Sequence, residues 1–410
     1  MKTVLFIAYN FPPCGGPSVQ RSLKFIKYLP GLGWQPIVIT TNARAYPIQD
    51  PGLEKDIPPG TPIYRPASWD VNAWRPAFTK LRLGKLHAAI NTLFALPDGA
   101  IFWARAARPS VRQAIAVHQP QIVYTTSGPY SAHLLGLWIK KTFGLPWVAD
   151  FRDPWSQNRL IHYPPGYRAI NRRMERRVLK SADHIVTVSR PIAQSLSDSM
   201  DGANTPISVI PNGYDPDDVP LLAPAETSKF TITYTGKFTR LRRPDALVEA
   251  VTSLVDSGQI PADKIELILA GSNLDAFIPS RPPFTKLGYL PHGELSALWQ
   301  RSTMLLLVQD PSSENNGAYS AKLFEYLAAN RPILAITSPS NVAADLIRQT
   351  QGGIVVSHDP AEIKTVLLDY YHAWQAKNVR HSPDWEIIHR FSRPELTARL
   401  ADIFNQLAGG

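Results

Sequence analysis

The sequence predicts an α/β protein built from two doubly wound, Rossmann-like domains. Two observations lead to this prediction. Apolar strand-like runs alternate with helical patterns along most of the 410 residues, and the alternation starts again after a stretch at 201–228 rich in Pro, Asp, Asn and Ala. Such alternation implies parallel sheets covered by helices, and the length exceeds what one core usually supports. We therefore expect two domains facing one another across a cleft, with ligands at the carboxyl ends of the strands.

The first half of the chain begins with a β-α-β unit. Residues 3–9 form an apolar run that predicts a buried strand; the start lacks the basic lead and small-residue cleavage site of a signal peptide. A Gly15-Gly16 turn, a helical pattern and a strand at 36–40 follow. Residues 46–77 are rich in Pro, so we expect a long surface excursion there. The other predicted elements of this half are strands at 121–126, 147–151 and 184–189 and helices at 131–144 and 168–182.

The second half repeats the alternation after a weakly periodic linker. We place the boundary near Ala225, which gives an N-terminal domain at 1–224 and a C-terminal domain at 225–390. The C-terminal helix, about residues 391–410, is expected to pack back on the first domain. The predicted elements are strands at 230–236, 265–272, 304–310 and 332–337, and helices at 245–258, at 293–302 and from 319 onward.

Composition excludes several classes of protein. Hydrophobic residues make up 44% and charged residues 19%, which fits a globular chain and excludes disorder. Cys14 is the one cysteine, so an internal disulfide is excluded, and a reducing compartment such as the cytoplasm is expected. No uninterrupted apolar run reaches the roughly 18 residues that a membrane span requires.

Charge is distributed unevenly along the chain. Residues 1–180 hold 24 Lys and Arg against 8 Asp and Glu, whereas the remainder holds 19 against 25. A basic half suggests an anionic partner. Residues 78–112 mix Lys and Arg with Leu, Phe and Trp, a composition suited to peripheral contact with an anionic membrane face; the alternative is a charged surface that serves solubility. We expect no nucleic acid, because the basic residues concentrate in helices beside strand–helix turns, whereas a nucleic-acid site needs a basic groove with interleaved aromatic residues and a known module.

Two glycine turns follow predicted strands. Gly15-Gly16 lets the backbone approach a ligand at the start of a helix, although a tight turn without a ligand is the alternative. The second turn begins at Gly236 and contains Lys237 and Arg242. Cations ahead of a helix suit a diphosphate; the alternative is a solvated basic loop.

A third candidate lies at a helix start in the second half. Gly317 precedes Ser320, which is placed to cap the helix, and Lys322 and Glu325 follow within about one turn. The helix start suits phosphate, and a carboxylate suits two neighbouring sugar hydroxyls. The alternative is a surface pair between Lys322 and Glu325.

Charged residues also end a strand in the first half. Asp150, Arg152 and Asp153 lie where a parallel sheet presents substrate contacts; the alternative is a structural Arg–Asp pair. Asp215 and Asp217 have a spacing seen in some metal sites, but other ligands are lacking nearby in sequence, so we expect no metal. A Gly-x-Ser-x-Gly nucleophile turn and a Walker-type loop are both missing.

Together these segments resemble the retaining glycosyltransferases of family 4, which have the GT-B fold. The similar segments are "FPPCGGPSVQRSLKFIKYLPGLGWQPIVIT", "ADHIVTVS", "VIPNGYDPDD", "YTGKFTRLRRPDALVEA", "LILAGS", "LGYLPHGEL" and "GAYSAKLFEYLAANRPILAI". The resemblance implies a hexosyltransferase-type, metal-independent enzyme that uses a nucleotide-sugar as substrate and needs no cofactor. It also implies front-face transfer with retained anomeric configuration, in which the leaving phosphate helps deprotonate the acceptor.

The resemblance assigns roles residue by residue. Lys237 and Arg242 match the family's diphosphate-binding Arg and Lys with their types exchanged, and Glu325 matches the carboxylate that binds the nucleotide ribose. The implied donor-binding residues are Gly15, Gly16, Gly236, Gly317, Ser320, Ala321, Lys322, Glu325, Tyr289 and Leu290. The implied catalytic residues are Lys237, Arg242, Asp150, Arg152 and Asp153.

The chain departs from the family's pattern at two places. Gly317 stands where the family has the first Glu of its Glu-x7-Glu motif, with Glu314 nearby but out of register. The segment 150–155 aligns with the family's N-domain histidine, so that Asp150, Arg152 or Asp153 must meet the sugar instead.

The acceptor follows from the fold and the charge. In the family the acceptor binds the N-terminal half, which is the basic half here. We therefore expect a glycan or lipid-linked acceptor at the cytoplasmic membrane face and a role in surface polysaccharide biosynthesis. The competing hypothesis is a nucleotide-sugar epimerase of the same fold, which needs no acceptor.

Overall fold

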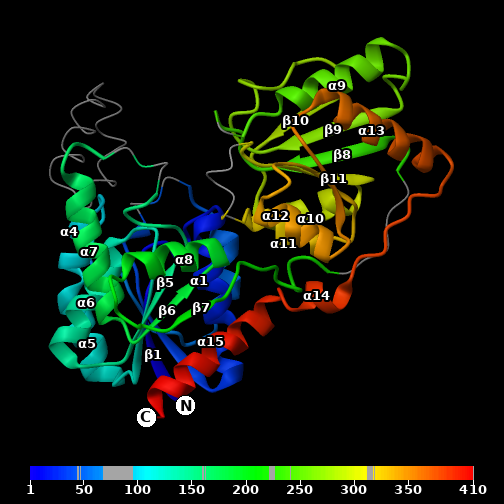
Figure 1. Ribbon diagram of the computed structural model, residues 1–410. Helices are drawn as coiled ribbons and strands as arrows, with labels where there is room; N and C mark the ends of the chain where they lie inside the picture. Colours follow the sequence, from blue (N-terminus) through cyan, green and yellow to red (C-terminus); the bar gives the residue numbers. More distant parts are fainter. Residues whose placement is uncertain are drawn as a thin grey trace, which may run out of the picture. The chain divides into compact units, whose positions relative to one another are not determined.

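The structure is a computed structural model that divides into two compact units (Figure 1). One unit comprises residues 1–211 and 393–410, and the other comprises 212–392. The predicted boundaries were 224/225 and about 390. The segment that contains Ala225 lies outside the described residues, and the predicted cleft between the domains stays a prediction. The described residues are 1–43, 46, 48–67, 96–158, 161, 163–220, 227–240, 242–311, 317 and 319–409.

The first unit contains a seven-stranded parallel sheet in the order β3-β2-β1-β4-β5-β6-β7. The inner strands of this sheet are buried on both faces, which explains their mostly apolar sequences, whereas the edge strands β3 and β7 are half-buried. Their bounds are β1 Lys2–Ile7, β2 Trp34–Ile39, β3 Ile63–Tyr64, β4 Ile122–Thr126, β5 Trp147–Phe151, β6 His184–Thr187 and β7 Ile207–Val209.

Helices and 3-10 turns connect these strands, and the C-terminal helix α15 belongs to the same unit. Trp34 of β2 packs edge-on against Phe404 of α15 at 5.3 Å between ring centroids. Arg399 of α15 donates to the carbonyl of Val209 in β7. The bounds are α1 Pro17–Tyr28, η1 Leu29–Leu32, η3 Pro51–Asp56, α4 Ile101–Ala106, α5 Arg108–His118, α6 Ser131–Phe143, α7 Tyr167–Ser181, α8 Arg190–Ser199 and α15 Arg393–Ala408.

The Pro-rich region at 46–77 is more ordered than the sequence suggested in its described part. It holds η3, whose Leu53 and Asp56 are buried, and the edge strand β3. Ile63 and Tyr64 pair with Val38 and Ile39 of β2. The strand was missed because two residues give no detectable alternation.

The second unit contains a six-stranded parallel sheet in the order β10-β9-β8-β11-β12-β13. On one side of the sheet, apolar residues of β8 and β9 pack against α9 and α13. On the other side, the sheet packs against α10, α11 and α12. The bounds are β8 Phe230–Thr235, α9 Asp245–Asp256, β9 Ile265–Ala270, β10 Phe284–Gly288, α10 His292–Gln300, β11 Met304–Val308, α11 Ala321–Ala328, β12 Ile333–Ile336, α12 Val342–Gln349, β13 Gly353–Val356, α13 Pro360–Gln375 and α14 Trp385–His389.

Each sheet has one topological switch point, where successive crossovers leave in opposite directions. It lies between β1 and β4 in the first unit and between β8 and β11 in the second. Ligands of open parallel sheets bind at the carboxyl ends of strands beside such points. The Gly15-Gly16 turn follows β1 and the Gly236 turn follows β8, so both glycine turns lie at these positions. No helix within the described residues is long and apolar enough to cross a membrane.

Candidate functional site

At the carboxyl edge of the second sheet, two glycines bring neighbouring turns into contact. Gly236, after β8, has φ 134°, and Gly271, after β9, has φ 150°, conformations that L side chains rarely adopt. A Cβ on Gly271 would lie 1.7 Å from the carbonyl oxygen of Gly236. The two positions therefore require glycine, and the backbone at the end of β8 is left open.

Lys322, in the first turn of α11, points at this turn. Its Nζ donates to the carbonyl of Thr235 at 2.9 Å and lies 3.6 Å from the ring centroid of Tyr234. Burial lowers the pKa of the Lys322 amine well below its usual range; the charge of Arg242 lowers it further, and Glu325 acts in the opposite direction. The Lys322 amine therefore contacts the end of β8 directly. The alternative prediction was a surface pair between Lys322 and Glu325.

Aromatic side chains fix α11 and the following turn to β8. The Tyr326 hydroxyl accepts from the Thr235 N–H at 2.9 Å and lies 3.0 Å from its Oγ1. Tyr234 stacks on Phe238 with centroids 4.1 Å apart and donates to the Lys237 carbonyl at 3.1 Å. The backbone of the basic turn is therefore positioned by buried rings.

The two predicted phosphate-binding cations both lie in this turn. Lys237 is exposed, and Arg242 is partly buried. The Arg242 N–H donates to Thr239 Oγ1 at 3.1 Å, and its carbonyl accepts from the Thr239 N–H at 3.2 Å. The structure thus brings Lys237, Arg242 and Lys322 to one end of β8, as expected for a cationic site.

Glu325 has partners that the sequence did not reveal. His292, at the start of α10, places Nε2 3.6 Å from Glu325 Oε1 and 3.5 Å from Asp218 Oδ2. All three side chains are 14–18% exposed. No motif links these residues, because His292 and Asp218 lie in other segments of the second unit. His292 Nε2 thus lies within ion-pair distance of both carboxylates when its imidazole is protonated.

The other predicted donor residues of the second unit follow its strands or begin α11. Ser320 is the N-cap residue of α11 by backbone conformation, but its side chain makes no capping hydrogen bond, unlike the predicted cap. The Leu323 N–H donates to the Ser320 carbonyl at 3.1 Å, and the amides before it have no acceptor inside the helix. Gly317 lies in a turn, and Glu314 is outside the described residues. Tyr289 and Leu290 follow β10; Tyr289 is 51% exposed.

In the first unit the Gly15-Gly16 turn is closely packed. The Gly15 N–H donates to the Ile48 carbonyl at 3.0 Å, and a Cβ on Gly15 would lie 2.9 Å from Ile48 Cγ2. Gly16 has φ 83° and begins α1 without a side-chain cap. Asn10 Nδ2 donates to the Gly128 carbonyl at 2.8 Å and ties the turn after β1 to the turn after β4.

Asp150 lies in β5 and is fully buried, in contrast to its predicted contact with the sugar. Arg21 of α1 binds it through Nε at 2.8 Å and Nη2 at 2.9 Å. Tyr124 and Thr126 donate to its Oδ2 at 2.6 and 2.8 Å. Burial alone would raise the pKa of Asp150, but the charge and hydrogen bonds of Arg21 hold it below the ordinary value. The structure therefore gives Asp150 a positioning role, and its partner is Arg21 rather than Arg152.

Arg152 is partly buried at the amino end of α1. Its Nη1 donates to the Ser18 carbonyl at 2.6 Å, and its N–H donates to Ser127 Oγ at 2.9 Å. Burial lowers its pKa, against the charges of Asp150 and Asp153. Asp153 is exposed. Of the three predicted first-unit residues, Arg152 and Asp153 remain candidates for substrate contact.

Ring stacking and hydrogen bonds anchor the loop that follows β5 and contains Arg152. Trp155 stacks on Tyr130 with centroids 4.9 Å apart and an interplanar angle of 6°. Its Nε1 donates to Asn171 Oδ1 at 2.8 Å. The buried carboxylate of Glu175 accepts from the N–H of Ser156 at 3.2 Å and from its hydroxyl. These contacts place the Arg152 backbone at the carboxyl edge of the sheet.

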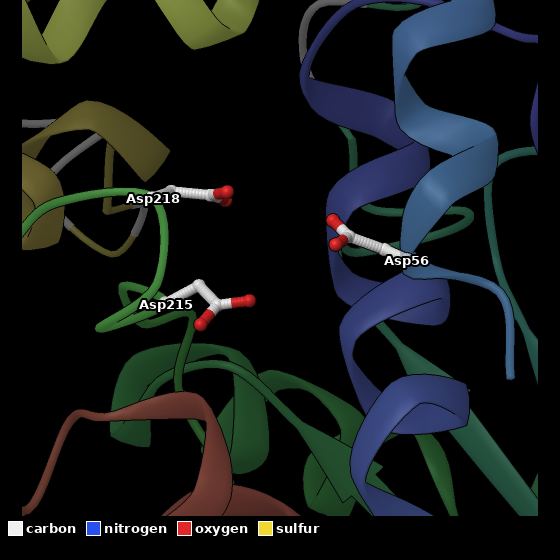
Figure 2. A group of neighbouring side chains, drawn as sticks. All are labelled: Asp56, Asp215 and Asp218. Carbon is white, nitrogen blue, oxygen red and sulfur yellow. The ribbon is translucent and has the colours of Figure 1, made fainter.

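Figure 2 shows three aspartates considered as metal ligands: Asp56, Asp215 and Asp218. Asp56 belongs to the first unit, and the other two belong to the second. Each has a basic or N–H neighbour within its own unit: Lys24 lies 2.6 Å from Asp56, the Asp217 N–H donates to Asp215 at 3.0 Å, and His292 lies near Asp218. The expectation that the site works without metal stays a prediction.

Part of the chain is similar to a known enzyme family. A family model described as Glycosyltransferase Family 4 matches residues 20–218. A search of curated proteins finds no match.

Three solved structures of similar fold span the whole chain at low identity. Sucrose-phosphate synthase from Thermosynechococcus elongatus has a TM-score of 0.66 at 14% identity, covering 100% of both chains. The lipopolysaccharide outer core galactosyltransferase WaaB has a TM-score of 0.56 at 15% identity, covering 98% of this chain and 99% of that chain. A putative UDP-N-acetylglucosamine 2-epimerase from Listeria monocytogenes has a TM-score of 0.58 at 13% identity, covering 100% and 98%. The match at 20–218 shows that this part of the chain is similar to family 4 glycosyltransferases, and the two doubly wound units have the GT-B fold of the glycosyltransferase structures.

Proposed function

We propose that this glycosyltransferase moves a hexose from a nucleotide-diphosphate donor to an acceptor hydroxyl with retention of the anomeric configuration. The observation that carries the proposal is the contact of Lys322, in the first turn of α11, with the Thr235 carbonyl at the end of β8, where the basic turn begins. This is the switch point of the second sheet, where a parallel α/β domain binds its ligand.

The proposed chemistry requires no protein nucleophile and no resident metal. Negative charge grows on the donor's diphosphate as the sugar leaves, and the leaving oxygen accepts the acceptor's proton on the same face. Lys237 and Arg242 neutralise this charge, and the Ser320 and Ala321 amides at the start of α11 contribute the helix dipole. Fixed cations and amides stabilise a leaving diphosphate more than an intact one, which is what lowers the barrier.

Glu325 would accept hydrogen bonds from two ribose hydroxyls, and the backbone at Tyr289 and Leu290 would contact the base. Diphosphate donors also agree with two structures of similar fold in complex with UDP: S. aureus MnaA with UDP, and a Methanocaldococcus jannaschii epimerase with UDP-GlcNAc and UDP. In the first unit, Arg152, Asp153 and the Gly15-Gly16 turn would meet the sugar end of the donor or the acceptor.

The acceptor is proposed to be a lipid-linked diphosphate sugar that the enzyme extends in surface polysaccharide biosynthesis, at the cytoplasmic membrane face. The excess of 24 basic over 8 acidic residues in 1–180 supports contact with anionic lipid. Most of the amphipathic stretch at 78–112 lies outside the described residues. Co-sedimentation with anionic liposomes at low salt tests the contact, with neutral liposomes as control. Protein that stays in the supernatant with both would contradict it.

A nucleotide-sugar epimerase is the second candidate, because the similar folds include UDP-N-acetylglucosamine 2-epimerases. One experiment separates the two. The chain is incubated with nucleotide sugars alone and together with lipid-linked sugar acceptors, and both are followed by NMR. Transfer only when acceptor is present, with the donor's anomeric configuration in the product, supports the proposal. Isomerisation of the donor alone would favour the epimerase, and an inverted product would contradict retention.

A further inference from the structure

Lys322 is enclosed by the end of β8. Its Nζ lies over the Tyr234 ring at 3.6 Å and donates to the Thr235 carbonyl at 2.9 Å. A Cβ on Gly236 would lie 3.2 Å from the same nitrogen, so any other residue at position 236 would require the Lys322 amine to move slightly. An ammonium group has three N–H donors, and the contacts named here use one of them on an acceptor oxygen. The amine therefore adjoins the open backbone at which the diphosphate is proposed to bind.

Among the described residues, the charged and titratable groups near this amine come from β8, its turn and α11. Tyr234 contacts the amine, and Arg242 and Glu325 act on its charge. Tyr326 of α11 binds the same Thr235, and the Lys237 carbonyl accepts from Tyr234. Glu325 in turn faces His292 of α10 and Asp218 of the segment before β8. Burial and Arg242 both disfavour a positive charge on Lys322, and burial raises the pKa of both tyrosines, which stay neutral.

We propose that Lys322 is a phosphate ligand that gains its charge together with the donor, so that binding of a nucleotide-diphosphate sugar takes up one proton at Nζ. This inference rests on the proposed function, because it places the donor's diphosphate at the Gly236 turn. The step balances simply: the neutral amine takes a proton from solvent to become an ammonium, and no bond of the donor changes.

The physical reason lies in the number of cations at one strand end. In the free enzyme a charged Lys322 would be desolvated and repelled by Arg242. A diphosphate brings two negative charges, which reverse the balance and favour the ammonium. Over the pH range between the free and bound pKa values of this amine, affinity then falls about tenfold for each unit of rising pH. Below that range affinity is independent of pH.

Calorimetric titration in buffers of different ionisation enthalpy measures the protons taken up. The probes are UDP-glucose, GDP-mannose, ADP-glucose and dTDP-glucose, because a diphosphate esterified at both ends does not itself titrate near neutrality. We expect wild-type protein to take up as much as one proton with the probe it binds, and its affinity to fall as pH rises from neutral to mildly alkaline.

Two variants test the assignment to Lys322. Lys322→Met removes the amine, and Lys322→Gln retains an N–H donor for Thr235 while staying neutral at every pH. Both should bind at least about tenfold more weakly near neutral pH, with no proton uptake and a flat pH profile. Lys264→Met is the matched control, since that side chain is exposed at the opposite end of β9; its uptake and affinity should equal those of wild type. Thermal melting confirms that each variant is folded.

The outcomes separate this inference from the proposed function. Binding of a probe by wild type without proton uptake would overturn the inference alone. The same follows if both Lys322 variants retain the wild-type uptake, because the proton would then reside elsewhere, for example on His292. Failure of all four probes to bind wild-type protein would overturn the proposed donor site and this inference with it.

Discussion

The guanidinium of Arg21 donates two hydrogen bonds, of 2.8 and 2.9 Å, to the carboxylate of Asp150 inside the first unit. The side chain of Arg21 is 1% exposed and that of Asp150 is 0% exposed. Arg21 also donates to the carbonyls of Ile210 and Pro211 at the end of this unit. One ion pair thus connects α1, β5 and the last residues before the chain enters the second unit. Because both side chains are buried, we expect this ion pair to contribute to the stability of the first unit.

Replacing one member of this pair should strongly destabilise the first unit. In Asp150→Asn an amide N–H₂ faces Arg21 Nη2, which leaves the buried guanidinium uncompensated. We expect a loss of about 3–5 kcal/mol in the free energy of unfolding, measured by urea denaturation. The control is Glu386→Gln in the exposed Arg390–Glu386 pair, which should cost less than about 1 kcal/mol. Equal small losses in both variants would refute the structural role of Asp150.

Buried His133 should make the first unit sensitive to mild acid. Burial lowers its pKa to about 3, and Nδ1 lies 2.8 Å from Thr125 Oγ1. The unfolded chain binds a proton near pH 6.5 and the folded chain does not. This contribution is therefore neutral above pH 6.5 and destabilising as pH falls toward 3, by about 2 kcal/mol at pH 5. His133→Gln should remove that part of the pH dependence in denaturation at pH 7.5 and pH 5. An unchanged slope would show that His133 is protonated in the fold.

Gly271→Ala should disrupt the edge of the second sheet. The new Cβ would meet the Gly236 carbonyl oxygen, and the turns after β8 and β9 would have to separate. We expect a loss of about 1–3 kcal/mol or more in stability, together with weaker donor binding. Gly258→Ala is matched to it, since Gly258 also has positive φ but has nothing within 4 Å of its Cβ position. It should lower stability by about 1 kcal/mol and leave binding unchanged. Similar effects of the two would argue against close approach of the turns.

Glu325→Ala should weaken nucleotide-sugar binding while the fold remains intact. Two ribose hydroxyls lose a charged acceptor, and a loss of about 1.5–3 kcal/mol, or roughly tenfold to a hundredfold in affinity, is expected. Calorimetry measures the affinity, and thermal melting measures the fold. Glu249→Ala, an exposed position of α9, is the control. Unchanged affinity in Glu325→Ala would count against the ribose contact.

Local signals predicted the buried inner strands and the two glycine turns, but not the strands β3, β7, β10 and β13. The run at 3–9 corresponds to β1, whose buried residues are all apolar, and the run at 230–236 corresponds to β8, where apolar residues alternate with buried threonines. Glycines that follow these two strands predicted the switch-point turns, because glycine allows backbone conformations with positive φ.

Contacts between distant segments could not be predicted in the same way. Asp150 and Arg21 lie 129 residues apart, and nothing local distinguishes their pairing from an Asp150–Arg152 pair. The sequence placed Lys322 one turn before Glu325, but helix periodicity does not say that the amine bends to the end of β8. His292 and Asp218 reach Glu325 only through the packing of α10 and the segment before β8.

The most direct test of the donor site at α11 and the end of β8 is a thermal-shift comparison of wild type and Glu325→Ala with UDP, GDP, ADP and dTDP. A ligand that binds only the native state raises the melting temperature according to its affinity and concentration. We expect at least one of the four nucleotides to stabilise wild type and the same nucleotide to stabilise Glu325→Ala much less. If none of the four shifts wild type, or if the shift is equal in both proteins, the donor site is not at α11 and the end of β8.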